Sequence, residues 1–387
     1  MSGGKNMSIS QNVMTENTMS NPSAFETLRK AADRYVNSGK PLSITAHSIC
    51  KSISKSVVMS RLEIESYNPL NRSIGPYIID IRDFDTEMPD AYFLGHIPGA
   101  VHIPWRKLTQ LKTLNSLPKD RQIVVYSSTG QTGGQAAAIL SLLGFDAVNL
   151  KWGITSWTDD AAAAPARYSP EKDILWQNES YRSTVTNNLE PDIRYDVPEI
   201  AVEGRTPESI IWSAADEYLR QYKVENISAG SLYDPLFAIL HPLYVSPYEE
   251  PDKDMLVLPF GVQPGEHDES FTWPFILDVR TETEYAQGHI PACVHIPFTE
   301  LFSSNNVRKL PPDRQIVVVS NTGHTSAHIA ALLNLLGYDA VNLKWGMSGW
   351  CSPDKLNITD SYSIDRDCMK YPVVKGWNPG KAAECKG

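Results

Sequence analysis

LLGFDAVNLKWG, at residues 142–153, returns at residues 335–346 as LLGYDAVNLKWG, with a single change from Phe to Tyr. Two further matches keep the same offset: DRQIVV at 120–125 and 313–318, and GHIP at 95–98 and 288–291. Segments that hold one register over so long a span are copies of one domain. The sequence therefore predicts two related modules in one polypeptide.

Each copy alternates short apolar runs with a helical segment. The apolar runs of the first copy are 77–81, 100–104, 123–126 and 147–150, and its helical segment is 134–143. Those of the second copy are 275–279, 293–296, 316–319 and 340–343, with a helical segment at 326–336. A similar leading helix precedes each copy, AADRY at 31–35 and AADEY at 214–218. Strands that alternate with helices favour an α/β fold, with a parallel sheet covered on both faces.

The repeat divides the chain into five predicted parts. They are a disordered leader at 1–28, a first module at 29–160, a polar linker at 161–208, a second module at 209–353 and a tail at 354–387. The second module carries an acidic, Pro-rich insertion at about 241–273. The N-terminal stretch is polar and lacks the apolar centre of a secretory signal, which predicts a cytoplasmic protein.

Net charge and hydrophobicity exclude some classes of binding partner. The 387 residues carry a net charge of −10, which argues against nucleic acid and anionic membranes, and no apolar run approaches transmembrane length. Nothing in the sequence predicts a metal site or an organic cofactor. The five cysteines show no metal or redox spacing and are expected to be reduced, with Cys368 and Cys385 the one pair that could bridge.

A short loop between a strand and a helix carries the chemistry of each copy. SSTGQT at 127–132 follows the third clear strand of the first copy, and SNTGHT at 320–325 follows its counterpart. Backbone N–H groups at such a helix start form a cradle for an anion. The predicted anion-binding residues are Ser128, Thr129, Gly130, Gln131 and Thr132 in one loop, and Asn321, Thr322, Gly323, His324 and Thr325 in the other.

These features together resemble the rhodanese superfamily of sulfurtransferases. The matching motifs are D-x-R at 80–82 and 278–280, G-H-I-P, the strand–loop–helix, and G-x-x-x-W at 153–157 and 346–350. The resemblance covers roughly 77–159 and 275–353. It implies two domains, each a five-stranded parallel sheet with helices on both faces. It also implies a six-residue loop headed by a cysteine that takes sulfane sulfur from a donor such as thiosulfate and passes it to a thiol or cyanide.

Both loops depart from the family at this catalytic position, where Ser127 and Ser320 replace the cysteine. A serine hydroxyl cannot form a persulfide, and neither loop has an Arg or Lys to hold thiosulfate. The sequence therefore predicts a non-catalytic module that binds an oxyanion, such as a small sulfur compound, or a protein sulfur carrier or acceptor. The alternative is an active thiosulfate sulfurtransferase whose thiol comes from elsewhere. A phosphatase fits less well, because related phosphatases have a longer loop with cysteine and arginine.

Each of the remaining polar motif residues has two possible roles, one structural and one in catalysis or binding. Asp80, Arg82, Asp278 and Arg280 are expected to form structural ion pairs rather than act as acids and bases, and His96 and His289 to make structural hydrogen bonds. His324 could activate Ser320 as a base, but the expected role is a contact at the pocket rim. There it would gain a proton near neutrality and strengthen anion binding below about pH 6.5. Its loop is the one expected to regain sulfur loading more readily when its serine is changed to cysteine.

Overall fold

A computed structural model describes residues 19–20, 22–52, 75–82, 91–175, 193–221, 226–232 and 274–378. It contains two five-stranded sheets whose strands are all parallel, in the order β2-β6-β5-β3-β4 and β8-β12-β11-β9-β10. The first sheet consists of β2 (Ser43–Ile44), β3 (Tyr77–Asp80), β4 (Val101–His102), β5 (Ile123–Tyr126) and β6 (Ala147–Leu150). The second consists of β8 (Asn226–Ile227), β9 (Phe275–Asp278), β10 (Val294–His295), β11 (Ile316–Val319) and β12 (Ala340–Leu343). The prediction of two α/β modules with parallel sheets is confirmed.

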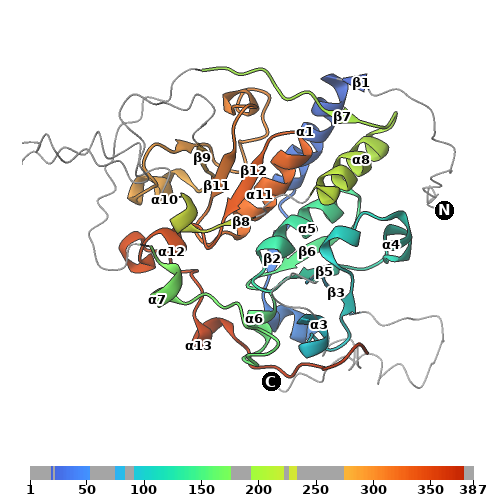
Figure 1. Cartoon of the computed structure of the whole chain (residues 1–387), viewed down its shortest axis with the longest axis vertical. Coiled ribbons are helices and arrows are strands. Elements are labelled where there is room, and N and C mark those ends of the chain that lie inside the picture. Colours follow the sequence, from blue (N-terminus) through green and yellow to red (C-terminus); the bar gives the residue numbers. More distant parts are fainter. Residues whose placement is uncertain are drawn as a thin grey trace, which may run out of the picture.

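Four helices lie between the two sheets (Figure 1). They are α1 (Pro22–Val36), α5 (Gln131–Leu142), α8 (Pro207–Arg220) and α11 (His324–Leu335). Successive strand residues point to opposite faces, so Ile79 and Val125 join these helices in one large core while Ile78 and Val124 face the other side of the sheet. The core is continuous across both repeats, so neither module buries its apolar face alone.

The helices that lead the two repeats cross to the opposite module. Tyr35 at the end of α1 bonds His328 of α11 with 2.8 Å between Oη and Nδ1, and Tyr218 of α8 donates to Gln135 of α5 at 2.9 Å. The repeat offset makes Gln135 the counterpart of His328, so the two contacts are related by approximate twofold symmetry. Gly134 allows α5 to approach α11 closely, because a Cβ there would lie 3.0 Å from the His328 ring.

Shorter elements complete the modules. The first repeat adds α3 (Ala91–Leu94), a 3-10 turn η2 (Trp105–Lys107), α4 (Leu111–Ser116) and α6 (Ile154–Trp157). The second adds α10 (Glu282–Gln287), η4 (Val307–Lys309), α12 (Met347–Trp350) and η5 (Pro353–Leu356). A separate antiparallel pair joins β1 (Met19–Ser20) to β7 (Ala201–Val202). Helix α1 begins before the predicted module boundary at residue 29, because Phe25 and Leu28 are already core residues.

The segment that follows each repeat in the sequence packs against the opposite module. The stretch around α7 (Pro170–Asp173) lies against α12, where Leu175 N donates to Gly349 O at 3.0 Å. The stretch around α13 (Ile364–Asp367) lies against α6, where Met369 N donates to Ser156 O at 2.9 Å. Parts of the predicted linker and tail are therefore ordered surfaces of the opposite module. The predicted insertion at 241–273 lies outside the described residues.

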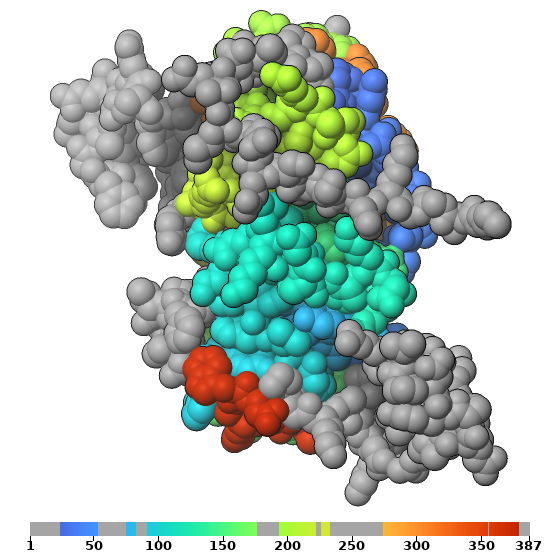
Figure 2. Space-filling view, turned by 90° about the vertical axis from the view of Figure 1, so that its right-hand side faces the viewer, coloured from blue at the N-terminus to red at the C-terminus, as the bar shows by residue number. Residues whose placement is uncertain are grey.

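The C-terminal segment continues across the first module. Trp157 Nε1 donates to Pro372 O at 2.8 Å, Val374 pairs with His96, and Gly376 N donates to Phe93 O at 2.8 Å. In Figure 2 this segment, in red, lies directly on the first repeat. In the part of the chain that the structure describes, no helix is long and apolar enough to cross a membrane.

Candidate functional site

The loop of the first repeat is built around the Ser127 hydroxyl. Strand β5 ends at Tyr126 and α5 begins at Gln131, with Gly130 as the N-cap in a left-handed conformation, φ 82°. A Cβ on Gly130 would lie 2.8 Å from Leu150 O, so only glycine fits the turn. Ser127 Oγ accepts hydrogen bonds from the backbone N–H groups of Gly130 and Gly133, both at 3.1 Å. The hydroxyl oxygen thus occupies the cradle.

The loop of the second repeat has the same geometry with one addition. Ser320 Oγ accepts from Gly323 N at 3.1 Å and from Ser326 N at 3.2 Å, and lies 2.8 Å from Ser326 Oγ. Ser326 Oγ donates its proton to Asn342 Oδ1 at 2.6 Å, so Ser320 must donate to Ser326. The Ser320 hydroxyl therefore has a partner for its proton and for both lone pairs.

One difference between the repeats changes the surroundings of the two loop serines. Gly133 stands in the first repeat where Ser326 stands in the second, so Ser127 has no neighbouring hydroxyl at this position. Asn149, the counterpart of Asn342, has a buried Oδ1 without a partner among the described residues. Neither asparagine was predicted as part of the site, although each is a polar residue in an otherwise apolar strand and occurs in the duplicated stretch.

The two loops face each other across the boundary between the repeats. Asn342 Nδ2 of the second repeat donates to Gln131 Oε1 of the first at 2.9 Å, and Trp152 N of the first donates to His324 Nε2 of the second at 3.1 Å. Ser127 is 7% exposed and Ser320 is 5% exposed. The cradles are therefore internal surfaces of the tandem protein, each contacted by the opposite repeat.

His324 lies inside this boundary, so its predicted place at the pocket rim is wrong. The residue is 4% exposed, and burial, with a smaller effect from Lys151, lowers its pKa to about 3. Its Nε2 lies 3.1 Å from Trp152 N and 3.2 Å from Thr129 O of the first repeat, and its Nδ1 lies 3.1 Å from Thr322 Oγ1. The lowered pKa keeps the imidazole neutral near pH 6.5, which argues against the expected strengthening of anion binding below that pH.

The Asp–Arg motifs connect the ends of β3 and β9 to nearby turns through buried ion pairs and hydrogen bonds. Arg82 pairs with Asp80, with 2.5 Å between Nη2 and Oδ2, and donates to Gly95 O at 2.7 Å. Arg280 pairs with Asp278 at 2.7 Å and donates to Gly288 O at 2.7 Å. All four side chains are buried.

The two motif histidines sit in the same turns. His96 Nδ1 bonds Tyr92 O at 2.9 Å and His289 Nδ1 bonds Tyr285 O at 3.1 Å. Each imidazole also stacks on the ring of that tyrosine, at centroid distances of 3.7 Å and 4.0 Å. Both histidines are therefore held by turn contacts rather than presented to the serine cradles.

Four aromatic side chains close the boundary between the repeats beside the loops. They are Trp152, Tyr168, Trp345 and Tyr362, and they form a buried cluster of their own. Tyr168 donates to Ser348 O at 2.7 Å, and Tyr362 donates to Thr155 O at 3.0 Å. Each tyrosine therefore comes directly after one repeat in the sequence and donates a hydrogen bond to the other repeat.

The cysteines offer no substitute nucleophile in the described chain. Cys293, Cys351 and Cys368 are buried, reduced thiols, so Cys368 does not form the disulfide that the sequence allowed. Cys50 is disulfide-bonded, so the expectation that all the cysteines are reduced is wrong. Burial raises the pKa of the Cys293 thiol far above its usual value. Among the described residues, no group of three or more His, Cys, Asp or Glu side chains could hold a metal ion.

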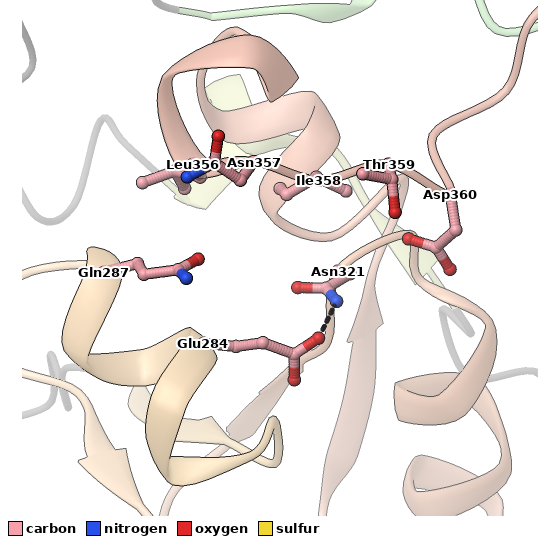
Figure 3. A pocket seen from close by; sticks show the side chains of 8 residues that line it. All are labelled: Glu284, Gln287, Asn321, Leu356, Asn357, Ile358, Thr359 and Asp360. Carbon is pink, nitrogen blue, oxygen red and sulfur yellow. Dashed lines mark hydrogen bonds between the residues drawn. The ribbon is translucent and has the colours of Figure 1, made fainter.

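A pocket of about 160 Å³ opens beside the second loop (Figure 3). Asn321, the second residue of that loop, lines it together with Glu284 and Gln287 of α10 and the segment 356–360. Asn321 Nδ2 donates to Glu284 Oε1 at 2.5 Å. Asn321 was predicted as a loop residue, whereas Glu284 and 356–360 carry no motif that could have placed them at a site.

Two parallel sheets, each with a six-residue loop between its central strand and a helix, define a tandem α/β protein. The sequence profile of the Rhodanese-like domain matches residues 64–160 and 264–353. The chain belongs to the rhodanese-like family.

Individual known proteins align with parts of the chain of different length. The chain is 33% identical over 76 residues to a sulfurtransferase of Allochromatium vinosum, which spans 19% of this chain and 69% of that protein. It is 24% identical over 108 residues to a thiosulfate:glutathione sulfurtransferase of Saccharomyces cerevisiae, spanning 25% of this chain and 78% of that protein. A solved thiosulfate sulfurtransferase from Pseudomonas aeruginosa aligns with 93% of this chain and 50% of its own, at 14% identity and a TM-score of 0.26.

Proposed function

We propose that this protein is a non-catalytic member of the rhodanese-like family that acts by binding a protein. The observation that carries the proposal is the position of the two serine hydroxyls. Each occupies its cradle and accepts two backbone N–H groups, the donors that would stabilise a thiolate or an anionic intermediate. A hydroxyl there cannot bond a sulfane sulfur.

Protein binding is favoured over anion binding in the cradles. The N–H donors that an oxyanion would need already bond Ser127 and Ser320, and both residues are buried between the repeats. Neither loop has a cationic side chain to add attraction. Because the relatives are sulfurtransferases, the partner class we expect is a protein that carries or accepts sulfur.

The first expected result is negligible sulfur transfer by the wild-type protein. Cyanolysis with thiosulfate, and separately with mercaptopyruvate, should give no turnover above the rate without protein. An ordinary rhodanese run in parallel provides the positive control. Turnover comparable to that control would favour the alternative, an active sulfurtransferase with a thiol donated from elsewhere in the chain, and would overturn the proposal.

Replacing serine with cysteine should restore sulfur loading more readily in the first loop. Ser127→Cys places the larger thiol beside Gly133, whereas Ser320→Cys must fit against Ser326 Oγ, now 2.8 Å from the hydroxyl. This reverses the order expected from the sequence, because His324 faces the other repeat and cannot contact a donor. Mass spectrometry after thiosulfate treatment would detect an added sulfur atom.

The double variant Ser320→Cys with Ser326→Gly is the matched control, since it places beside Cys at 320 the glycine that stands beside Ser127 in the first repeat. It should load more sulfur than Ser320→Cys alone. Equal loading of the two single variants would show that the Ser326 hydroxyl does not limit the second site.

A further inference from the structure

Every polar side chain that lines the pocket beside the second loop carries at least one hydrogen-bond acceptor. Its polar lining residues come from α10, the second loop and the segment after η5, and are Glu284, Gln287, Asn321, Asn357, Thr359 and Asp360. In the described part of the chain, no lysine or arginine lines the pocket. The site therefore has the chemistry to receive a donor rather than an anion.

Two acceptors in the pocket are rigidly placed. Glu284 closes the capping box of α10, where its Oε2 accepts from Thr281 N at 3.0 Å and from Thr281 Oγ1 at 2.7 Å, while Oε1 accepts from Asn321. Burial alone would raise the pKa of Glu284, but these hydrogen bonds and the charge of Arg280 outweigh it and lower the pKa. The carboxylate is therefore ionised at neutral pH.

Asn321 has an acceptor that nothing in the described structure satisfies. Its Nδ2 is committed to Glu284, so its Oδ1 faces the opposite way, toward Gln287 in Figure 3. This oxygen is buried and has no hydrogen-bond partner among the described residues. A buried acceptor without a partner costs about 1–3 kcal/mol, which a donor that reached it would recover.

The nearby cations leave one negative charge of the pocket unmatched. Lys151 lies 3.1 Å from Asp360 and offsets it, Arg280 is engaged with Asp278, and Arg366 donates to Thr359 O at 2.9 Å. The Arg366 contact also fixes the rim segment. Among the residues that the structure describes, Glu284 is the pocket carboxylate without an ion-pair partner.

We propose that this pocket binds the guanidinium group of an arginine side chain on a protein partner. A guanidinium presents five donors in one plane, which suits acceptors that approach from three separate elements. Lysine would satisfy fewer of them, and the anionic donors of sulfur chemistry would be repelled by Glu284. The inference rests on the proposed protein-binding role and names the group that is recognised.

The test is a titration of the full chain with N-acetyl-arginine amide, followed by NMR of the Asn321 side-chain amide and of the Gly323 backbone amide. Both signals should shift, while Gly130 in the first loop should not. N-acetyl-citrulline amide, which is neutral but of similar shape, and thiosulfate should leave all three unchanged. The lysine analogue should bind more weakly. An equal response to citrulline or lysine would overturn the proposal.

Glu284→Gln should weaken binding at least about tenfold, the loss expected for a hydrogen bond to a charged group. Glutamine can still serve in a capping box, so the helix should survive. Glu282→Gln removes the same charge from an exposed position of the same helix and should leave the affinity within about twofold, because exposed charges act weakly. Equal losses in the two variants would show a diffuse charge effect instead of a site.

Asn321→Ser inserts the residue of the first loop and removes the unsatisfied oxygen, so it should also weaken binding. Tighter binding of free L-arginine than of the blocked amide would indicate a metabolite and overturn the assignment to a partner's side chain. If no arginine compound binds and the protein still shows no sulfur transfer, the proposal for the pocket is rejected while the non-catalytic role stands. Sulfur turnover, in contrast, would reject the non-catalytic role.

Discussion

Acid should destabilise this protein steeply, because two histidines at the boundary between the repeats must remain neutral. Burial lowers the pKa of His324 to about 3 and that of His328 to about 3, whereas both would titrate near 6.5 in the unfolded chain. Between these values the unfolded state binds protons that the folded state does not. Stability is therefore full above about pH 6.5 and falls as the pH is lowered, by up to about 1.4 kcal/mol per pH unit for each histidine.

Urea denaturation between pH 7 and pH 4 would measure this slope. The control is the double variant His324→Gln with His328→Gln, because glutamine stands at both equivalent positions of the first repeat, Gln131 and Gln135. Protonated carboxylates destabilise both proteins alike, so the difference between their slopes isolates the histidines. Identical slopes would mean that the imidazoles reach solvent in the folded state.

The duplicated stretch was sufficient to predict the architecture of each module. Apolar runs such as 123–126 and the helix ending before Gly144 follow from local patterns of burial and turn formation, and both are present as β5 and α5. The edge strands β2 and β8 were missed. Each has only two residues with partly buried side chains, so neither shows an alternation that a sequence pattern could reveal.

The arrangement of the two modules could not be read from the sequence, because it depends on contacts between distant residues. Tyr35 and Tyr218 look like ordinary positions of two similar helices, yet each bonds the opposite repeat. The wrong prediction for His324 has the same origin. A histidine at a loop position suggests contact with solvent and ligand, and only the opposing backbone of Thr129 and Trp152 shows that it is an internal residue.

The sequence showed where the two loops lie, but it did not show which groups accept hydrogen bonds from the loop N–H groups. The cradle N–H groups were predicted to be available to a ligand, whereas the Ser127 and Ser320 hydroxyls accept them. The difference between Gly133 and Ser326 was visible in the sequence. Its consequence for the two loops depends on Asn342, which is close to Ser326 only in the folded chain.

Removing the carboxylate of Asp278 should destabilise the folded protein strongly. Asp278→Ala leaves the Arg280 guanidinium buried at 4% exposure without its partner, which lies 2.7 Å away. Breaking a buried ion pair from one side costs about 3–5 kcal/mol. The remaining bond from Arg280 to Gly288 O cannot balance the charge, so urea unfolding should show a loss of this size.

Asp313→Ala is the matched control, because this aspartate pairs with Arg314 at 3.9 Å and its side chain is 73% exposed. Its loss should cost no more than about 1 kcal/mol. Replacing the whole buried pair, Asp278→Leu with Arg280→Met, should recover part of the stability lost in Asp278→Ala, since no uncompensated charge is left inside. If Asp278→Ala costs as little as Asp313→Ala, the Arg280 head group must reach water, and the motif does not hold the turn at Gly288 through a buried charge.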